Sequence, residues 1–172
     1  YKILKAKEWA GLNHLKPIDL SNLGKDLNSL EADLLNRKLY EASLTLLSNK
    51  ETILPLKRLD TLKIASVSFG DRSKNTFQKS LDNYAAVTHF NLTADASKKE
   101  CDSLVKTLSK FNLVLACLNN TNVRPAKNFG VSEKSIELLD SIQAHTKVVL
   151  TVLANPACLS KFKNPLQFNA LV

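Results

Sequence analysis

The sequence predicts an α/β fold in which an open, mostly parallel sheet has helices on both faces. Two observations lead to this prediction. From about residue 61, short apolar runs alternate with segments whose apolar residues recur every three to four positions, the period of a helix. Two of the runs, residues 113–118 and 148–153, are almost entirely apolar, which is typical of parallel strands covered on both sides.

Local signals predict where the individual elements begin. Residues 97–100 (Ser-Lys-Lys-Glu) have the form of a capping box, and Ser132 precedes a later helix as its cap. Asp71 and Ser73 are the expected caps of the first helix after residue 61. The predicted strands cover residues 62–69, 85–92, 113–118, 148–153 and 170–172, and the helices cover 73–84 and begin near 98 and 133.

The first 60 residues have a different pattern. Residues 1–9 predict a helix that ends at Gly11, and a connector follows. From Leu27, apolar residues recur at 30, 34, 39, 42 and 46, which predicts one long amphipathic helix before an extended stretch at 51–56. We therefore expect interdomain helices over residues 1–60 and an α/β domain over 61–172, in which the chain end interrupts the last strand.

Composition limits the classes of function. The 172 residues carry a net charge of +8, but the basic residues are scattered and only 6% of residues are aromatic, so no nucleic-acid partner is expected. No apolar run approaches the roughly 18 residues needed to span a bilayer, so no membrane span is expected. The chain lacks an initiating Met and is interpreted as a piece of a longer protein.

Cofactor and metal motifs are missing from the sequence. The three cysteines form no Cys-x-x-Cys pair, which argues against a zinc or thioredoxin-type site. Residues 69–74 contain one glycine, too few for a dinucleotide or phosphate-binding loop. Asn119 and Asn120 follow the third strand where a phosphoacceptor domain would place an acid. We therefore predict no cofactor and no metal.

Candidate ligand-binding residues follow the carboxyl ends of the predicted strands, where ligands bind in open parallel sheets. Asn side chains both donate and accept hydrogen bonds, which suits sugar hydroxyls. The alternatives are that Asp71 serves as a helix cap and that the Asn-rich loop at 119–130 is a solvated turn. The candidates for residues near a substrate are Asp71, Arg72, Asn119, Asn120 and Arg124.

No catalytic residue is predicted in this chain. The three histidines, His14, His89 and His145, have no Ser, Cys or carboxylate in a recognisable triad arrangement, so structural roles are expected. Glycoside hydrolysis normally needs two carboxyl groups that flank the scissile bond. The pair Glu133 and Glu137 lies one helical turn apart, an arrangement typical of a solvated helix face.

Several stretches resemble family 3 glycoside hydrolases. The most specific is residues 42–50 (ASLTLLSNK) with the following ILPL at 53–56, which looks like the entry to that family's second domain. The family often has Gly where Ala154 stands here. The other stretches that carry the resemblance are residues 1–12 (YKILKAKEWAGL), 62–67 (LKIASV), 128–130 (NFG) and 155–156 (NP).

The resemblance implies a flavodoxin-like α/β sandwich at the C-terminal side of a catalytic (β/α)8 barrel that is missing from this sequence. It implies a retaining enzyme. In the branch that cleaves β-N-acetylglucosaminides, the catalytic residues lie on the barrel, whereas in other branches, such as the β-glucosidase type, a Glu of this second domain serves as acid/base. No Glu follows the predicted strand ends here apart from Glu133 at a helix start, which favours the first branch. The implied partners are that barrel and the carbohydrate substrate of the parent enzyme. A bacterial origin, a role in carbohydrate metabolism and a periplasmic or extracellular location are also implied.

A second hypothesis stays open at this stage. A stand-alone module of flavodoxin-like architecture would hold a nucleotide or small anion at residues 70–73, beyond the first strand of the sheet.

Overall fold

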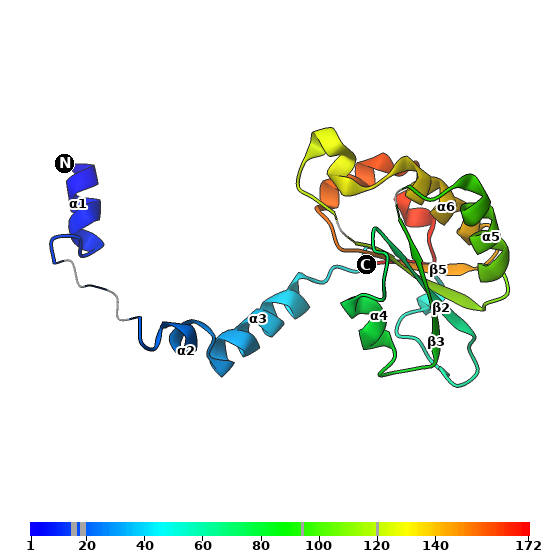
Figure 1. The fold of residues 1–172 in the computed structure, drawn as a ribbon, viewed down its shortest axis with the longest axis horizontal. Helices are drawn as coiled ribbons and strands as arrows, with labels where there is room; N and C mark the ends of the chain where they lie inside the picture. Colours follow the sequence, from blue (N-terminus) through cyan, green and yellow to red (C-terminus); the bar gives the residue numbers. More distant parts are fainter. Residues whose placement is uncertain (15–16, 18–19, 94, 120) are drawn as a thin grey trace. The chain divides into compact units, whose positions relative to one another are not determined.

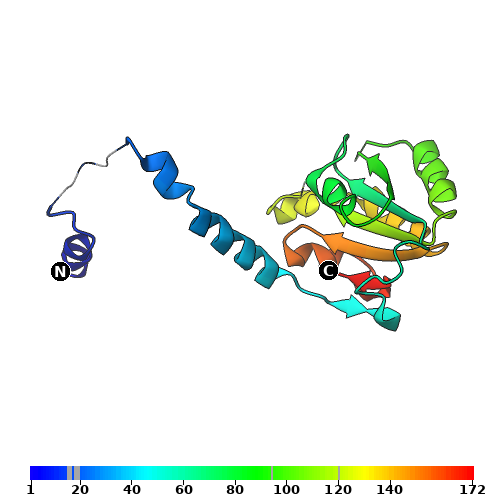
Figure 2. The same ribbon diagram turned by 90° about the horizontal axis from the view of Figure 1, so that it is seen from below.

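The computed structural model describes residues 1–14, 17, 20–93, 95–119 and 121–172. The chain divides into two compact units, residues 1–44 and 45–172. Residues 45–60 belong to the unit that contains the sheet. Their short strand β1 (Ser48–Asn49) pairs with β6 (Ala170–Leu171) at one edge of it (Figure 2). The expected division into interdomain helices over residues 1–60 and an α/β domain over residues 61–172 stays a prediction.

In the described part of the second unit, six strands form one sheet in the order β1-β6-β5-β4-β2-β3. All neighbouring pairs are parallel except β1 with β6. This confirms the predicted mostly parallel α/β fold. The central strands are β2 (Ile64–Phe69), β4 (Leu113–Leu118) and β5 (Lys147–Val152), and β3 (Val87–Leu92) forms the edge opposite β1.

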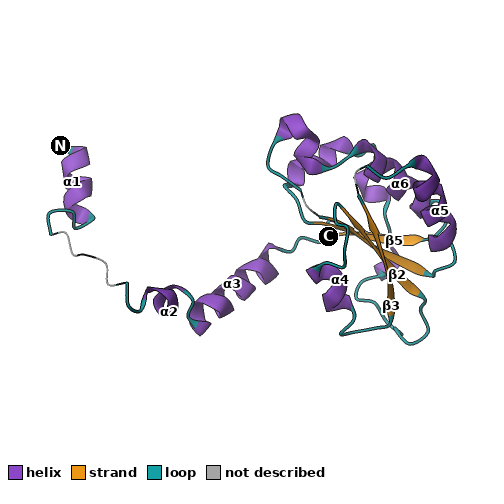
Figure 3. Cartoon of the chain, viewed as in Figure 1, coloured by secondary structure: helices purple, strands orange, loops and turns teal. Residues whose placement is uncertain are grey.

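Helices cover both faces of the sheet, as predicted (Figure 3). Helix α4 (Thr76–Leu81) packs with Ile64 and Leu115 on one face. Helices α5 (Lys98–Leu108) and α6 (Glu133–Gln143) cover the other face, where Leu108 and Leu139 are fully buried in the larger core. Short 3₁₀ helices follow β4 at Pro125–Gly130 and β5 at Pro156–Lys161 and Pro165–Gln167.

Two of the three predicted helix caps are present. Ser97 forms a capping box with Glu100 at α5, and the Ser132 side chain accepts from the Ser135 N–H at α6. The prediction for α4 is wrong. Asn75, rather than Asp71 or Ser73, caps this helix, and the Gln78 side chain accepts from the Asn75 N–H. The helix therefore begins three residues later than predicted.

The stretch predicted to be extended at 51–56 is also different. A 3₁₀ turn covers Lys50–Thr52, and Glu51 and Thr52 have φ of 53° and 48°. The Asn49 side chain closes this turn, because its amide donates to the Leu54 carbonyl (2.8 Å) and its carbonyl accepts from the Leu54 N–H (3.0 Å). A side chain that bonds the backbone locally competes with an extended strand.

The first unit contains α1 (Lys2–Trp9), α2 (Leu23–Leu27) and α3 (Leu30–Ser43). Gly11, with φ +73°, follows α1 as predicted. The single long helix predicted from Leu27 is broken, because Ser29 adopts an extended conformation and caps α3 by accepting from the Ala32 N–H. None of the residues described between 1 and 44 is buried.

Candidate functional site

The candidate residues gather at the carboxyl edge of the parallel strands. Asp71 and Arg72 follow β2, and Asn119 and Arg124 follow β4, the neighbour of β2 in the sheet. The chain leaves β2 toward β3 and leaves β4 toward β5 on the opposite side, so the crevice between β2 and β4 is the topological switch point. Asn120 lies outside the described residues.

Asp71 is the centre of a polar cluster at this switch point. Its Oδ2 accepts from Asn119 Nδ2 at 2.5 Å, from Asn75 Nδ2 at 2.8 Å and more weakly from Ser68 Oγ at 3.4 Å. The Asn75 amide also donates to Ser68 Oγ at 2.7 Å. Asp71 therefore links the end of β2, the start of α4 and the end of β4, which is a positioning role rather than the capping role predicted for it.

Arg72 lies at the same edge but faces solvent. Its guanidinium is 3.7 Å from the Asp95 carboxylate, and the two side chains are 83% and 75% exposed. A hydrogen bond from Thr93, the Asp95 backbone and the nearby Arg72 together lower the pKa of Asp95. An exposed ion pair of this kind adds little stability, so the Arg72 side chain is available to a ligand or neighbouring surface.

The loop after β4 is held by its own backbone. The Arg124 carbonyl accepts from the N–H groups of Lys127 and Phe129, and the Asn122 N–H donates to the Phe129 carbonyl at 2.8 Å. Phe129 is buried in the core although its φ is +56°, and Asn128 has φ +49°. Left-handed conformations are costly for residues other than glycine. This loop is thus fixed by the buried ring, and Arg124 is exposed on it.

Two of the described amide side chains at this loop bond to the protein itself. The Asn119 amide donates to Asp71, and the Asn122 carbonyl accepts from the Arg124 N–H at 2.9 Å. These two Asn side chains are therefore less available to sugar hydroxyls than the exposed side chains of Arg72 and Arg124.

The crevice itself is small. A cavity of about 20 Å³ is lined by Gly70, Asn119, Gly130 and Ser132, among other residues of this edge. This volume suits one water molecule. A Cβ at Gly130 would meet Thr121 and Asn122 at 3.0 Å, so the backbone segments already approach closely. The small volume weighs against the hypothesis that a nucleotide binds beside Gly70.

His89 has the Ser and carboxylate partners that the sequence did not reveal. Its Nδ1 is 2.7 Å from Ser66 Oγ and its Nε2 is 2.7 Å from Asp82 Oδ1, so a Ser-His-Asp chain is present. Asp82 precedes His89 by seven residues, but Ser66 precedes it by 23, and parallel pairing of β2 with β3 places Ser66 opposite His89. Only the register of the sheet reveals this arrangement.

This chain of hydrogen bonds lacks an accessible nucleophile. Ser66 is fully buried, and its Oγ also accepts from Gln78 Nε2 at 3.2 Å. Asp82 is also paired with Lys74, and the hydrogen bonds from Lys74 and His89 lower the pKa of Asp82. The network ties α4 to β2 and β3, so the structural role expected for His89 fits its surroundings.

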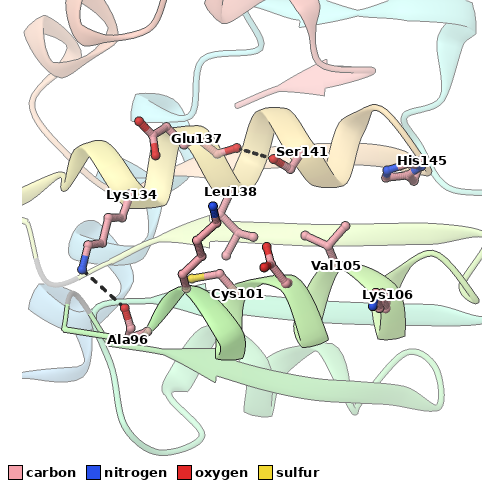
Figure 4. A pocket seen from close by; sticks show the side chains of 11 residues that line it. Ala96, Cys101, Val105, Lys106, Lys134, Glu137, Leu138, Ser141 and His145 are labelled. Atoms are coloured by element: carbon pink, nitrogen blue, oxygen red, sulfur yellow. Dashed lines mark hydrogen bonds between the residues drawn. The ribbon is translucent and has the colours of Figure 1, made fainter.

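A groove of about 660 Å³ lies between α5 and α6 (Figure 4). Cys101, Val105 and Leu138 form apolar parts of its wall. Figure 4 shows Lys134 reaching toward α5, where its Nζ is 3.5 Å from the Ala96 carbonyl. The charged and titratable residues that line the groove are Lys98, Asp102, Lys106, Lys134, Glu137 and His145.

Two carboxylates, Asp102 and Glu137, line this one groove. Both side chains are exposed, and the groove is open to solvent. In Figure 4 the Glu137 carboxylate points away from α5. Glycosidase carboxyl pairs face each other across a bound sugar, and one of them needs a raised pKa. Glu133 is also exposed and does not line the groove, so the pair Glu133 and Glu137 forms no site.

Cys117 and Cys158 lie in environments that disfavour the reactive thiolate. Burial and the nearby Asp71 raise the pKa of Cys117 to about 12, and burial raises the pKa of Cys158. Among the described residues, no group of three or more His, Cys, Asp or Glu side chains is arranged to hold a metal ion. No described helix is long and apolar enough to cross a membrane.

Comparison with known proteins adds two solved structures of similar fold. A fungal multi-domain family 3 β-N-acetylglucosaminidase, described as containing a GCN5-related glucosamine N-acetyltransferase region, matches 91% of this chain with a TM-score of 0.62 and 20% identity. A family 3 β-N-acetylglucosaminidase from Paenibacillus sp. str. FPU-7 matches 98% with a TM-score of 0.65 and 14% identity. No protein-family model and no curated protein sequence matches the chain.

These matches cover only part of each enzyme. The chain spans 17% of the fungal protein and 32% of the Paenibacillus protein. At this level of identity the likeness concerns the fold. The chain therefore shares its fold with a portion of two family 3 β-N-acetylglucosaminidases.

Proposed function

We propose that this chain is the non-catalytic C-terminal domain of a family 3 glycoside hydrolase, and that the parent enzyme is a retaining β-N-acetylhexosaminidase. The observation that carries this proposal is the fold likeness, which covers nearly all of this chain but a third or less of two such enzymes. The sequence resemblance at residues 42–56 supports the same parent family. A bacterial origin and a periplasmic or extracellular location form part of the proposal.

The chemistry of the described residues supports a non-catalytic role. Glycoside hydrolysis needs two closely placed groups on either side of the scissile bond. The carboxylates of the groove, Asp102 and Glu137, are exposed, and Asp71 is held by two Asn side chains. The catalytic groups of the parent are therefore assigned to a preceding (β/α)8 barrel.

The first unit supports packing against such a barrel. Its helices carry many large apolar side chains that are more than half exposed, including Trp9 at 90% and Leu30 at 82%. Exposed apolar surface of this extent is characteristic of an interface. We propose that residues 1–44 pack on the barrel. The large exposed apolar residues of this unit are Tyr1, Ile3, Leu4, Trp9, Leu12, Leu20, Leu27, Leu30, Leu34, Leu35, Leu39, Tyr40 and Leu44.

The carboxyl edge of the sheet is the part of this domain that we propose lends loops to the rim of the active site. Arg72 and Arg124 are the exposed groups that would contact a carbohydrate or the barrel. Asp71 and Asn119 would position these loops through their mutual hydrogen bond.

The non-catalytic assignment is tested with the chain alone on an aryl β-N-acetylglucosaminide. We expect no release of the aryl group above the uncatalysed rate. Turnover at enzyme-like rates by the purified chain contradicts the assignment. The coding sequence upstream of Tyr1 provides a second test, because it should encode a (β/α)8 barrel.

The rim proposal is tested in the full-length polypeptide with Arg72→Ala and Arg124→Ala. Because these residues would contact bound substrate but not the reacting atoms, we expect KM to rise several-fold with kcat nearly unchanged. Lys63→Ala is the matched control, since Lys63 is exposed beside the opposite end of β2. If KM and kcat of the three variants equal those of the unsubstituted polypeptide, Arg72 and Arg124 have no role at the rim of the active site.

A further inference from the structure

The strand β3 forms one edge of the sheet. All six residues of Val87–Leu92 pair with β2 in continuous parallel register, and no described strand pairs with the other side of β3. The opposite edge is the two-residue strand β1. Figure 1 shows β3 at its edge beside β2.

The backbone groups of β3 alternate in direction. The Gly70 N–H donates to the Leu92 carbonyl at 2.9 Å, so Leu92 turns its backbone groups toward β2. In a parallel ladder, alternate residues do the same, so Thr88 and Phe90 also face β2. Val87, His89 and Asn91 therefore face outward. In the described part of the chain, no hydrogen bond reaches the backbone N–H or C=O of these three residues.

The sequence of β3 lacks several features that protect natural edge strands. Natural edges carry Lys, Pro, bulges or short strands that prevent pairing with another chain. The sequence Val-Thr-His-Phe-Asn-Leu has no Lys, Pro or Gly, and its pairing with β2 has no bulge. We propose that β3 pairs antiparallel with β3 of a second copy of this chain, so that the two sheets become continuous across a two-fold axis.

The outward groups fix the register of this pair. In an antiparallel pair, an outward-facing residue must lie opposite another outward-facing residue. All three outward residues, Val87, His89 and Asn91, lie opposite outward residues of the second copy in one register only. In that register His89 lies opposite His89 of the second copy, and Val87 lies opposite Asn91. A parallel arrangement of two identical strands offsets the hydrogen bonds and breaks the two-fold symmetry of a closed dimer.

The side chains suit this register. Thr88 is exposed and would lie opposite half-buried Phe90 of the second copy, on the face covered by α5. Cross-strand pairs of aromatic and β-branched residues stabilise sheets. On the other face, Asp82 pairs with both Lys74 and His89, so the charge near the axis is nearly balanced despite the net charge of the chain.

The expected dimer is weak and reversible. The register supplies six interstrand backbone hydrogen bonds, and such bonds contribute modestly once the cost of association is included. We expect the full chain to dimerise at roughly tens of micromolar and to dissociate on dilution.

The variant Thr88→Lys tests this proposal by sedimentation velocity over a concentration series. It places two like charges about 7 Å apart across the axis, at an exposed position that leaves the ladder to β2 intact. We expect its dimer dissociation constant to rise about tenfold or more. Ser160→Lys adds the same charge at an exposed position after β5, remote from β3 in the sheet order, and should leave the constant unchanged.

Residue-resolved amide exchange identifies the surface directly. As the concentration rises through the dimer range, exchange of Val87, His89 and Asn91 should slow, whereas Thr88 and Phe90 should exchange slowly throughout. A monomer at all concentrations overturns the proposal. A dimer that Thr88→Lys and Ser160→Lys weaken equally also overturns it, as does a dimer in which the amides of Val87, His89 and Asn91 stay unprotected. In either case the two copies would associate through another surface, such as residues 1–44.

Discussion

At the residue scale, Asp71 shows how a candidate ligand-binding carboxylate becomes a structural one. It satisfies the amides of Asn75 and Asn119, which come from two different loops at the carboxyl edge. Both amides are half-buried, so they need acceptors within the protein, and Asn75 shares its amide between Asp71 and Ser68 Oγ.

Asp71→Ala should lower the free energy of unfolding by about 1–3 kcal/mol, because it removes the carboxylate acceptor from the half-buried Asn119 amide and one of two acceptors from the Asn75 amide. Urea denaturation followed by circular dichroism measures this change. Arg72→Ala, next in sequence and exposed, should change the stability by less than about 0.5 kcal/mol. Equal effects of the two substitutions contradict the role assigned to Asp71.

Cysteine reactivity is also decided residue by residue. The thiolate is the reactive form, and the raised pKa of Cys117 keeps its thiol protonated at neutral pH. Cys101 is half-exposed in the groove between α5 and α6, whereas Cys117 and Cys158 are buried.

Iodoacetamide at pH 8 should therefore modify Cys101 first in the folded chain and leave Cys117 and Cys158 largely unmodified, as read by peptide mass spectrometry. In denaturant all three should react at similar rates. Fast modification of Cys117 under native conditions is incompatible with its burial in β4.

At the element scale, α4 depends on polar contacts more than α5 does. Gln78 is fully buried in α4 and donates to Ser66 Oγ and to the Phe90 carbonyl. These bonds connect a six-residue helix to β2 and β3, where a longer helix would use an apolar stripe.

Asn75→Ala should therefore destabilise the fold by about 2 kcal/mol, near the upper end for loss of a helix cap, because Asn75 also donates to Asp71 and Ser68. Ser97→Ala, at the exposed cap of α5, should cost about 1 kcal/mol. The comparison is made by thermal and urea unfolding. A larger loss for Ser97→Ala contradicts the importance given to the α4 network.

At the scale of the whole molecule, the hydrophobic core lies within the second unit. Every buried residue among those described lies between Ile64 and Leu171, and the helices of the first unit bury none. Residues 45–63 are retained with the sheet by β1 and by the apolar residues 53–62 that pack on it.

A truncated chain of residues 45–172 should consequently fold alone, with an unfolding midpoint within a few degrees of that of the full chain. Calorimetry or circular dichroism measures this midpoint. A truncation that begins at residue 61 should be less stable, since it removes β1 and the apolar residues 53–59 that pack on the core. Unfolding of the 45–172 chain at room temperature contradicts the division into these units.

The sequence by itself determined the features that depend on neighbouring residues. The apolar runs at β4 and β5 identified central parallel strands, and Ser97 and Ser132 marked the starts of α5 and α6. Such signals work because backbone periodicity and capping involve residues within one helical turn or one strand. The same local signals misplaced α4, where Asn75 competes with Asp71 and Ser73 as a cap.

Only the tertiary structure decided the features that join distant residues. The Ser66–His89–Asp82 chain and the Asp71–Asn119 bond depend on the register of parallel strands, which no single segment encodes. The outward direction of Val87, His89 and Asn91 likewise follows from which residues of β3 bond to β2. Parallel strands are joined through intervening helices, so their register is set by packing across the whole sheet.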